Sequence, residues 1–481
     1  MNLKMVFFLM GRLVMAEGAM LLLPALVSAL YQEYSVMGVF LSISALCIAI
    51  GLALSMRKPQ NRVLYQREGF VITALGWIVI SLLGSLPFLL TGAITNPVDA
   101  LFETVSGFTT TGASVIANVE ILPRGVLFWR SFTHWIGGMG VLVFLLIVTP
   151  MSGGGSHVNL MKAESPGPQV EKLVPKVQLT AAILYGIYLA MTVVQIILLL
   201  LGGMPLFDAV TITFGTAGTG GFGIKNDSLA GYSTYLQAVV TVFMILFGIN
   251  FNFYFLIILR RFSRAFAMEE VRGYLAVIVA SVLIITANIC SMFDNVLEAF
   301  HHAAFQVGSI ITTTGFATVD FDLWPSASKT VLVILMFVGA CAGSTGGGMK
   351  VSRWMIILKN IQKEFRRILH PQSVQVTTMD GKTIPDEVVR SVNIFSLTYA
   401  VIFAVSVLLI SFDNHSMITN VTAIAATLNN IGPGLEMVGP TQNFSLYSDF
   451  STLVMTFDML AGRLELFPLL LLFYPRTWKK F

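Results

Sequence analysis

Threonine and glycine residues recur in four short turns between apolar segments. The first and third turns read FTTTGAS at 108–114 and TTTG at 312–315, and the second and fourth read GTGGF at 218–222 and NNIGP at 429–433. Threonine hydroxyls and main-chain carbonyls are neutral oxygen ligands that replace the water shell of a monovalent cation, and glycine permits dihedrals that turn carbonyls inward. Because none of the four turns contains a carboxylate, the pattern favours a monovalent ion over a divalent one.

The composition is that of an integral membrane protein. Of 481 residues, 56% are hydrophobic and 11% are charged, and the mean hydropathy is +0.81, which is far outside the range of soluble domains. A helix needs about 20 apolar residues to cross the hydrocarbon, and runs of about this length predict about ten spans. The runs lie near residues 6–30, 36–55, 70–93, 127–150, 179–202, 232–259, 273–293, 327–349, 391–411 and 449–474.

Basic residues set the orientation of these runs. They follow every second run, as at Arg57, Lys162 and Arg260, and they close the chain, whereas the intervening loops carry mostly acids. Lys and Arg in short loops stay on the cytoplasmic side of a membrane. Both termini are therefore predicted to be cytoplasmic. The net charge of +4 is scattered among these loops, so no nucleic-acid partner is expected.

A repeated unit organises the chain. Each turn follows an apolar segment of about 10 to 13 residues, which is too short to cross and is typical of a re-entrant helix. The copies can be aligned on the Phe that precedes each glycine. In this alignment the second copy, Phe207 to Gly221, is four residues longer than the first, Phe102 to Gly112. The difference predicts an additional helical turn of about 3.6 residues in the second copy. Irregular backbone at membrane depth must be buried in protein or line a water-filled cavity.

The sequence therefore predicts an all-α polytopic membrane protein. Four pseudo-symmetric units of helix, re-entrant pore helix, filter turn and helix would surround one pore, after an N-terminal transmembrane hairpin. The expected boundaries are 1–60 for the hairpin and 61–160, 161–265, 266–370 and 371–481 for the pore units.

A further glycine-rich stretch, GACAGSTGGGMK at 339–350, interrupts the run after the third turn. A nucleotide-binding phosphate loop would end in Gly-Lys followed by Ser or Thr, but Met349 and Val351 break that pattern. We interpret the stretch as a flexible strand across the permeation path, with close helix packing of small residues as the alternative. Arg463 lies at membrane depth and needs partners. We expect it to donate to the carbonyls of this strand, although it could instead only neutralise Asp458 or Glu465.

Taken together, these motifs resemble the Trk/Ktr/HKT superfamily of cation transporters, specifically its bacterial Trk-type potassium-translocating membrane subunit. The resemblance covers nearly the whole chain. Besides the four turns, it rests on FWRSFTHWIGGMG at 128–140, AESPGP at 163–168, GACAGSTGGGMKVSR at 339–353, LNNIGPGL at 428–435 and GRLELFPLL at 462–470.

The resemblance implies potassium uptake across the bacterial inner membrane, with potassium as the transported ion and no organic cofactor in this chain. It also implies a homodimer and a cytosolic nucleotide-binding regulatory subunit of the NAD or ATP type. In plant relatives a serine at the first filter glycine is associated with sodium transport, so Gly112 favours potassium. The implied filter residues are Thr110, Thr111, Gly112, Thr219, Gly220, Gly221, Thr313, Thr314, Gly315, Asn430, Ile431 and Gly432. The implied gate residues are Gly343, Ser344, Thr345, Gly346, Gly347, Gly348 and Arg463.

Two rival functions differ in class. An intramembrane protease needs a Ser/His pair or two facing aspartates, and the late intramembrane charges Asp458, Arg463 and Glu465 offer no nucleophile, so no enzyme is expected. A proton- or sodium-coupled potassium symporter is the closer alternative, because secondary carriers also use broken helices near the midplane, although their halves are usually inverted.

The remaining reactive residues carry structural interpretations. Cys47, Cys290 and Cys341 have no metal-ligand spacing and are expected to be reduced packing residues. Adjacent His301 and His302 point in different directions on a helix, so ordinary hydrogen bonds are expected rather than a shared metal. The basic segment 362–367 is expected to be solvated, with anionic lipid or a cytosolic partner as alternative contacts.

Overall fold

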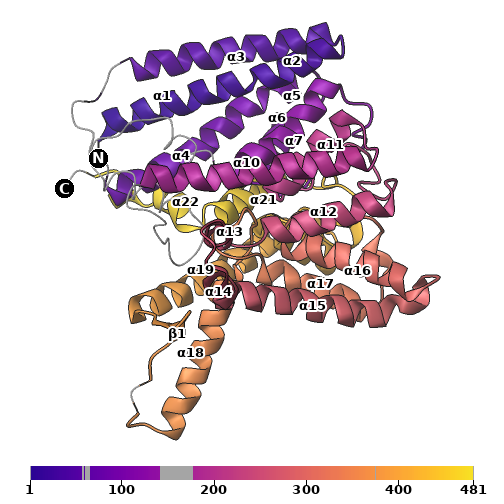
Figure 1. Ribbon diagram of the computed structural model, residues 1–481. Coiled ribbons are helices and arrows are strands. Elements are labelled where there is room, and N and C mark those ends of the chain that lie inside the picture. The colour runs from indigo at the N-terminus through magenta and orange to yellow at the C-terminus, as the bar shows by residue number, and fades with distance from the viewer. Residues whose placement is uncertain (1, 57–58, 60–64, 141–176, 374, 480–481) are drawn as a thin grey trace.

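The computed structural model describes residues 2–56, 59, 65–140, 177–373 and 375–479, and within these ranges the chain is almost entirely helical (Figure 1). It begins with a hairpin of α1 (Leu3–Met20), α2 (Leu22–Leu30) and α3 (Tyr34–Ser55). Small residues allow close packing in this hairpin, since a Cβ added at Gly51 would lie 2.6 Å from the carbonyl oxygen of Gly11.

The rest of the described chain repeats the order long helix, short helix, turn and second helix. The first copy comprises α4 (Gln66–Gly84), α5 (Leu86–Leu90), α6 (Pro97–Phe108) and α7 (Arg124–Gly138). The second comprises α10 (Val177–Leu201), α11 (Leu206–Gly218), α12 (Thr234–Phe247), α13 (Phe251–Ile258) and α14 (Phe262–Ala267). The boundary expected at residue 160 lies outside the described residues.

The third copy comprises α15 (Glu269–Ile289), η1 (Cys290–Met292), α16 (Val296–Ile311), η2 (Phe321–Leu323), α17 (Ser326–Val338) and α18 (Val351–Leu369). The fourth comprises α19 (Asp386–Ile410), η3 (Ser411–Asp413), α20 (Met417–Leu428), η4 (Glu436–Val438), α21 (Asp449–Arg463), α22 (Phe467–Leu472) and η5 (Pro475–Thr477). Between α18, which projects from the bundle (Figure 1), and α19, two short strands pair antiparallel: β1 (Thr378–Met379) and β2 (Lys382–Thr383).

Each short helix packs against its own unit and the preceding one. α6, α11, α16 and α20 all contact the two longer helices of their own copies. In addition, α11 contacts α7, α16 contacts α12 and α20 contacts α17, while α6 contacts α21 of the last copy. The arrangement of the four copies is therefore cyclic and closes between the fourth and the first.

Among the described residues, six helices are long and apolar enough to cross a membrane, and a seventh span results if α12 and α13 are counted together. These helices confirm a multi-pass membrane protein. The start of α1 and the end of the described chain lie on the same side of the bundle (Figure 1). The expected run at 127–150 lies partly outside the described residues.

Two expected spans are not continuous helices, and a third breaks at the glycine-rich stretch, as expected. The run 232–259 bends by 91° between α12 and α13, where Asn250 caps α13 by accepting a hydrogen bond of 2.9 Å from the N–H of Asn252. The run 327–349 ends its helix at Val338, before Gly339 with φ of 72°. The run 449–474 is interrupted after Arg463, where Glu465 and Leu466 have positive φ.

The lengths of the short helices also correct one expectation. α6, α11 and α20 have 12, 13 and 12 residues, whereas α16 has 16. The additional turn therefore belongs to the third copy, not the second. The alignment on phenylalanine was wrong because Phe207 lies in the first turn of its helix, while Phe102 lies in the middle of α6.

Candidate ion-conduction site

The four turns share one backbone conformation. In each, the residue two positions before the glycine is left-handed, with φ between 56° and 61°. The N–H of the residue before the glycine donates a 2.8 Å hydrogen bond to a carbonyl five positions earlier, which is the longer bond of a Schellman motif. The φ values of Gly112, Gly221, Gly315 and Gly432 are 82°, 77°, 86° and 101°. All four glycines therefore have positive φ, a conformation that glycine adopts at little cost.

The four glycines form a closed ring of contacts. A Cβ added at any of the first three would collide with the carbonyl oxygen of the residue just before the next glycine. A Cβ at Gly432 would lie 2.9 Å from the carbonyl oxygen of Thr111, which returns to the first turn. The contacts run from Gly112 to Gly220, from Gly221 to Thr314, from Gly315 to Ile431 and from Gly432 to Thr111. The turns thus surround one axis, and all the predicted filter residues lie together there.

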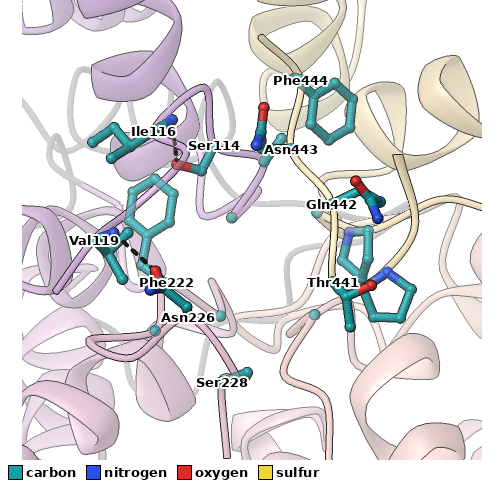
Figure 2. A pocket seen from close by; sticks show the side chains of 18 of the residues that line it. Ser114, Ile116, Val119, Phe222, Asn226, Ser228, Thr441, Gln442, Asn443 and Phe444 are labelled. Atoms are coloured by element: carbon teal, nitrogen blue, oxygen red, sulfur yellow. Dashed lines mark hydrogen bonds between the residues drawn. The ribbon is translucent and has the colours of Figure 1, made fainter. Parts of the chain in front are cut away.

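A cavity of about 150 Å³ lies over the ring and is lined by all four glycines and by the loops that follow the turns. Figure 2 shows the side chains around it, from Ser114 on one side to Thr441 on the other. Its cationic lining residues are Arg130 and Lys225. Arg130 is ion-paired, and the ammonium of Lys225 lies 4.1 Å from the ring centroid of Tyr232.

Most hydroxyls of the two threonine-rich turns are hydrogen-bonded, although the buried hydroxyl of Thr110 has no partner among the described residues. The hydroxyls of Thr109 and Thr111 are 2.8 Å apart, and those of Thr312 and Thr314 are 2.7 Å apart. Asn430 donates from Nδ2 to the hydroxyl of Thr111 at 2.9 Å, which joins the fourth turn to the first. Because these hydroxyls already have partners, the main-chain carbonyls are the more available ligands of the ring.

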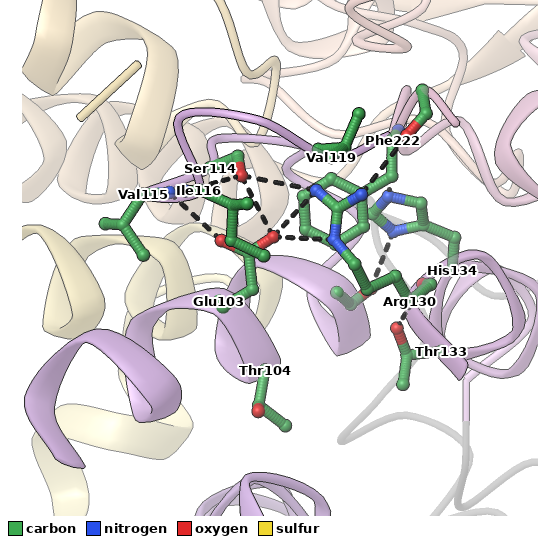
Figure 3. Close-up of polar contacts among 12 residues, drawn as sticks. Glu103, Thr104, Ser114, Val115, Ile116, Val119, Arg130, Thr133, His134 and Phe222 are labelled. Carbon is green, nitrogen blue, oxygen red and sulfur yellow. Dashed lines mark hydrogen bonds and ion pairs between the residues drawn. The ribbon is translucent and has the colours of Figure 1, made fainter. Parts of the chain in front are cut away.

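A buried ion pair braces the first two turns, as Figure 3 shows. Arg130 on α7 donates from Nε to Oε1 of Glu103 on α6 at 2.8 Å and from Nη1 to the carbonyl oxygen of Gly223 at 3.1 Å. The other oxygen of Glu103 accepts from the N–H of Val115 at 3.0 Å. The guanidinium carbon also lies 4.1 Å from the ring centroid of Phe222. One arginine therefore ties the segment after the first turn to the segment after the second.

His134, one helical turn after Arg130, makes a parallel bridge. Its Nδ1 lies 2.8 Å from the carbonyl oxygen of Gly107, and its Nε2 accepts from the N–H of Phe222 at 3.2 Å. This pair of partners assigns the proton to Nδ1, because a neutral imidazole has one donor and one acceptor nitrogen.

We did not predict Glu103, Arg130 and His134 as site residues from the sequence. A signal was nevertheless present. An Arg in an apolar helix and a Glu in the neighbouring short helix are both costly to bury unpaired, so pairing them would have indicated how α6 and α7 pack.

The glycine-rich segment between α17 and α18 contacts the ring from the side of α13. The N–H of Gly347 donates to the hydroxyl of Thr313 at 2.6 Å. The start of the glycine-rich segment is held by the break between α12 and α13. The N–H of Cys341 donates to the carbonyl oxygen of Gly248 at 3.0 Å, and the N–H of Phe251 donates to the carbonyl oxygen of Gly343 at 3.0 Å. The expected non-helical break in this run is confirmed.

Arg463, the last residue of α21, reaches this segment. Its Nη1 donates to the carbonyl oxygen of Thr345 at 3.0 Å, and its Nη2 donates to those of Gly137 and Gly138 at the end of α7. The acids considered as alternative partners have other contacts, since Asp458 accepts from Ser406 and Glu465 pairs with Arg353. The guanidinium thus joins the first, third and fourth units.

The other candidate residues have structural contacts. His301 contacts Gln237 and His302 contacts Thr318, and no group of three or more His, Cys, Asp or Glu residues suited to a metal occurs in the described part of the chain. Cys47, Cys290 and Cys341 are free thiols. Outside the membrane spans, Glu436 lies beside the loop that lines the cavity, and a hydrogen bond from Ser416, with another from Thr419, lowers its pKa.

Comparison with known proteins places the chain in one family. The TrkH model, described as cation transport protein, matches residues 37–480. Trk system potassium uptake proteins TrkH of Halomonas elongata and Escherichia coli (strain K12) are 35% and 33% identical to the chain, with full coverage of both proteins. Trk system potassium uptake protein TrkG of Escherichia coli (strain K12) is 31% identical over 99% of each chain.

A solved structure agrees with this relationship. The crystal structure of the potassium transporter TrkH from Vibrio parahaemolyticus matches with a TM-score of 0.89 and 31% identity over 100% of both chains. The proteins matched are named for transport rather than for catalysis, in line with the expectation that this chain is not an enzyme. By sequence and by fold, the chain belongs to the TrkH family of cation transport proteins.

Proposed function

We propose that this protein takes up potassium across the bacterial inner membrane through the ring of four glycine turns. The observation that carries the proposal is the closed cycle of contacts from Gly112 through Gly221 and Gly315 to Gly432. Four equivalent turns at one axis present carbonyl oxygens from all sides, as a dehydrated monovalent cation requires. The relatives named as potassium uptake proteins support potassium as the ion.

The four short helices favour a cation at this axis. Each ends at its turn, so the negative ends of the α6, α11, α16 and α20 dipoles point to the ring. The four pore units are assigned to 61–160, 161–265, 266–370 and 371–481, each contributing one turn. No carboxylate lines the cavity in the described part of the chain, which supports weak binding compatible with rapid passage.

We assign the gate to residues 343–348 and Arg463. The segment passes directly against the hydroxyl of Thr313 in the third turn, and Arg463 holds it through Thr345. An unscreened charge of the guanidinium would repel a cation by about 4 kcal/mol at 4 Å and an effective dielectric of 20. Both the strand and the charge therefore oppose permeation while this contact persists.

Regulation is assigned to partners outside this chain. The proposal includes a cytosolic nucleotide-binding subunit of the NAD or ATP type, a homodimer, contact with membrane lipid, and cytoplasmic termini. Basic side chains at the ends of α13, α14 and α18 support a docking surface for an acidic partner: Arg260, Arg261, Arg264, Arg366 and Arg367.

Rubidium flux into proteoliposomes tests the proposal and its alternative. Uptake that follows the rubidium gradient alone, unchanged by an imposed proton or sodium gradient, is expected for a pore. Uptake that is driven against the rubidium gradient by protons or sodium would support a coupled symporter. No rubidium uptake by correctly folded protein with its gate opened would contradict both.

A further inference from the structure

Two cationic side chains occupy three consecutive carbonyls of the glycine-rich segment. Arg463 donates to the carbonyl oxygen of Thr345 at 3.0 Å. The ammonium of Lys350 donates to the carbonyl oxygen of Gly346 and, at 3.2 Å, to that of Gly347. Lys350 is only 2% exposed, and its φ of 75° turns the chain so that the side chain folds back over the residues before it.

These carbonyls lie next to the inner ends of two filter turns. A Cβ added at Gly347 would lie 2.5 Å from the carbonyl oxygen of Asn429, and one at Gly346 would lie 2.9 Å from that of Thr312. Thr312 and Asn429 each stand three residues before a filter glycine. The Lys350 ammonium is therefore held close to the point where an ion would leave the ring.

Two arginines and two glutamates surround Lys350. The side chains that interact electrostatically with it are Arg353, Arg463, Glu270 and Glu465. Together with Lys350, these residues comprise three cations and two carboxylates. Without Lys350 they comprise two cations and two carboxylates. The set is therefore neutral without Lys350, and the lysine supplies one positive charge, the same charge that one potassium ion would carry.

An ammonium and a potassium ion also have the same charge and nearly the same size. An ammonium binds carbonyl oxygens at about 2.9 Å, and carbonyls of this kind replace the hydration shell of potassium in selective pores. We propose that the carbonyls of Gly346 and Gly347 form an inner potassium site, which the Lys350 ammonium occupies as a tethered competitor. This inference rests on the proposed potassium pathway.

Thallium(I), which binds potassium sites and scatters anomalously, provides the test. Crystals of the full chain are compared for wild type, Lys350→Met and the control Lys359→Met. Lys359 is a suitable control because its ammonium contacts Glu269 and the carbonyl oxygen of Thr378, outside the ring and the glycine-rich segment. Thallium peaks in the filter are expected in all three proteins. An additional peak between the carbonyls of Gly346 and Gly347 is expected only in Lys350→Met.

The outcomes separate the two proposals. Filter peaks without an additional peak in Lys350→Met would overturn the inner site and leave the proposed function intact. An absence of peaks in the filters of all three proteins would count against the potassium pathway itself. If Lys350→Met does not fold, Lys350→Leu is used, and equilibrium binding of radioactive rubidium is measured in membranes. The Lys350 variant is expected to bind one more rubidium ion per chain than Lys359→Met. Equal rubidium binding by the two variants would overturn the inner site.

Discussion

Arg463 and Thr345 are joined by a hydrogen bond of 3.0 Å from the guanidinium Nη1 to the carbonyl oxygen, which connects the end of α21 to the glycine-rich segment. The same guanidinium donates through Nη2 to the end of α7. A segment without helical hydrogen bonds of its own is thus held by a residue from another unit. Any movement of the segment away from the axis must break this contact or carry Arg463 with it.

Arg463→Ala should raise rubidium flux in the absence of the partner. Removing the charge lowers a barrier of about 4 kcal/mol at most, so the increase can reach the order of several hundred-fold. The preference for potassium over sodium should be kept, because the filter turns are unchanged. Arg476→Ala, in η5 near the chain end, is the control. A folded Arg463→Ala protein with flux at or below that of wild type would contradict the assigned gate.

Gly112→Ser should reduce the preference for potassium over sodium. Gly112 has φ of 82°, so a side chain adds strain of about 1 kcal/mol, and its Cβ would also displace the carbonyl of Gly220 in the next turn. The measurement is the reversal potential under bi-ionic conditions.

Gly203→Ser is the matched control for this change. Gly203 also has φ of 82°, but a Cβ there meets nothing within 4 Å. It should carry the strain without altering selectivity. Equal reversal potentials for Gly112→Ser and wild type would remove Gly112 from the filter.

Arg130→Met should destabilise the protein strongly. The substitution leaves Glu103, whose side chain is fully buried, without its charge partner, and breaking a buried pair in this way costs about 3 to 5 kcal/mol. Thermal unfolding in detergent should show a large decrease in Tm, and the double variant with Glu103→Gln should recover part of it.

An exposed ion pair provides the control for Arg130. Lys363 contacts Asp386, whose side chain is 89% exposed, and exposed pairs contribute about 0 to 1 kcal/mol. Lys363→Met should therefore leave Tm nearly unchanged. If both substitutions lowered Tm equally, the brace between the first two turns would have no special role.

Acid should weaken the hydrogen bonds that join Glu436 to Ser416 and Thr419. Its pKa is lowered, first by the hydrogen bond from Ser416, so the unfolded chain binds a proton more readily than the folded one. The stabilisation is therefore present above the ordinary pKa of 4.5 and is lost as the pH falls through the lower folded value. Thermal unfolding between neutral pH and this acidic range should depend less on pH in Glu436→Gln. An identical pH dependence in both proteins would refute this role.

The proposed cytosolic partner should bind most tightly at low ionic strength. Contacts between exposed charges are screened over about 10 Å at 0.1 M salt and over shorter distances above it. Association with the purified partner, measured by size-exclusion chromatography or light scattering, should decrease as salt rises. An absence of association even at low salt would contradict the docking proposal.

Much of the architecture could be read from local patterns. Apolar run length indicated a multi-pass membrane protein but not the breaks within the runs 232–259 and 449–474. The recurrence of glycine after threonine or asparagine located the four turns, because a left-handed turn at a helix end depends on few neighbouring residues. Gly339 to Lys350 was likewise recognisable as a break, since a glycine cluster at membrane depth is a poor helix.

The tertiary structure alone decided how these parts meet. No local signal placed Gly112 against Gly220, because this contact depends on a turn that another unit brings alongside. Glu103 and Arg130 belong to one unit, and there the sequence offered only the cost of burying each charge alone, while the fold supplied the contact between them. The position of the Lys350 ammonium also depends on the tertiary structure. Its side chain can bind the carbonyls of Gly346 and Gly347 because the backbone turns at Lys350 itself, but only the packing of that segment beneath the third and fourth turns puts the bound charge near the path of an ion.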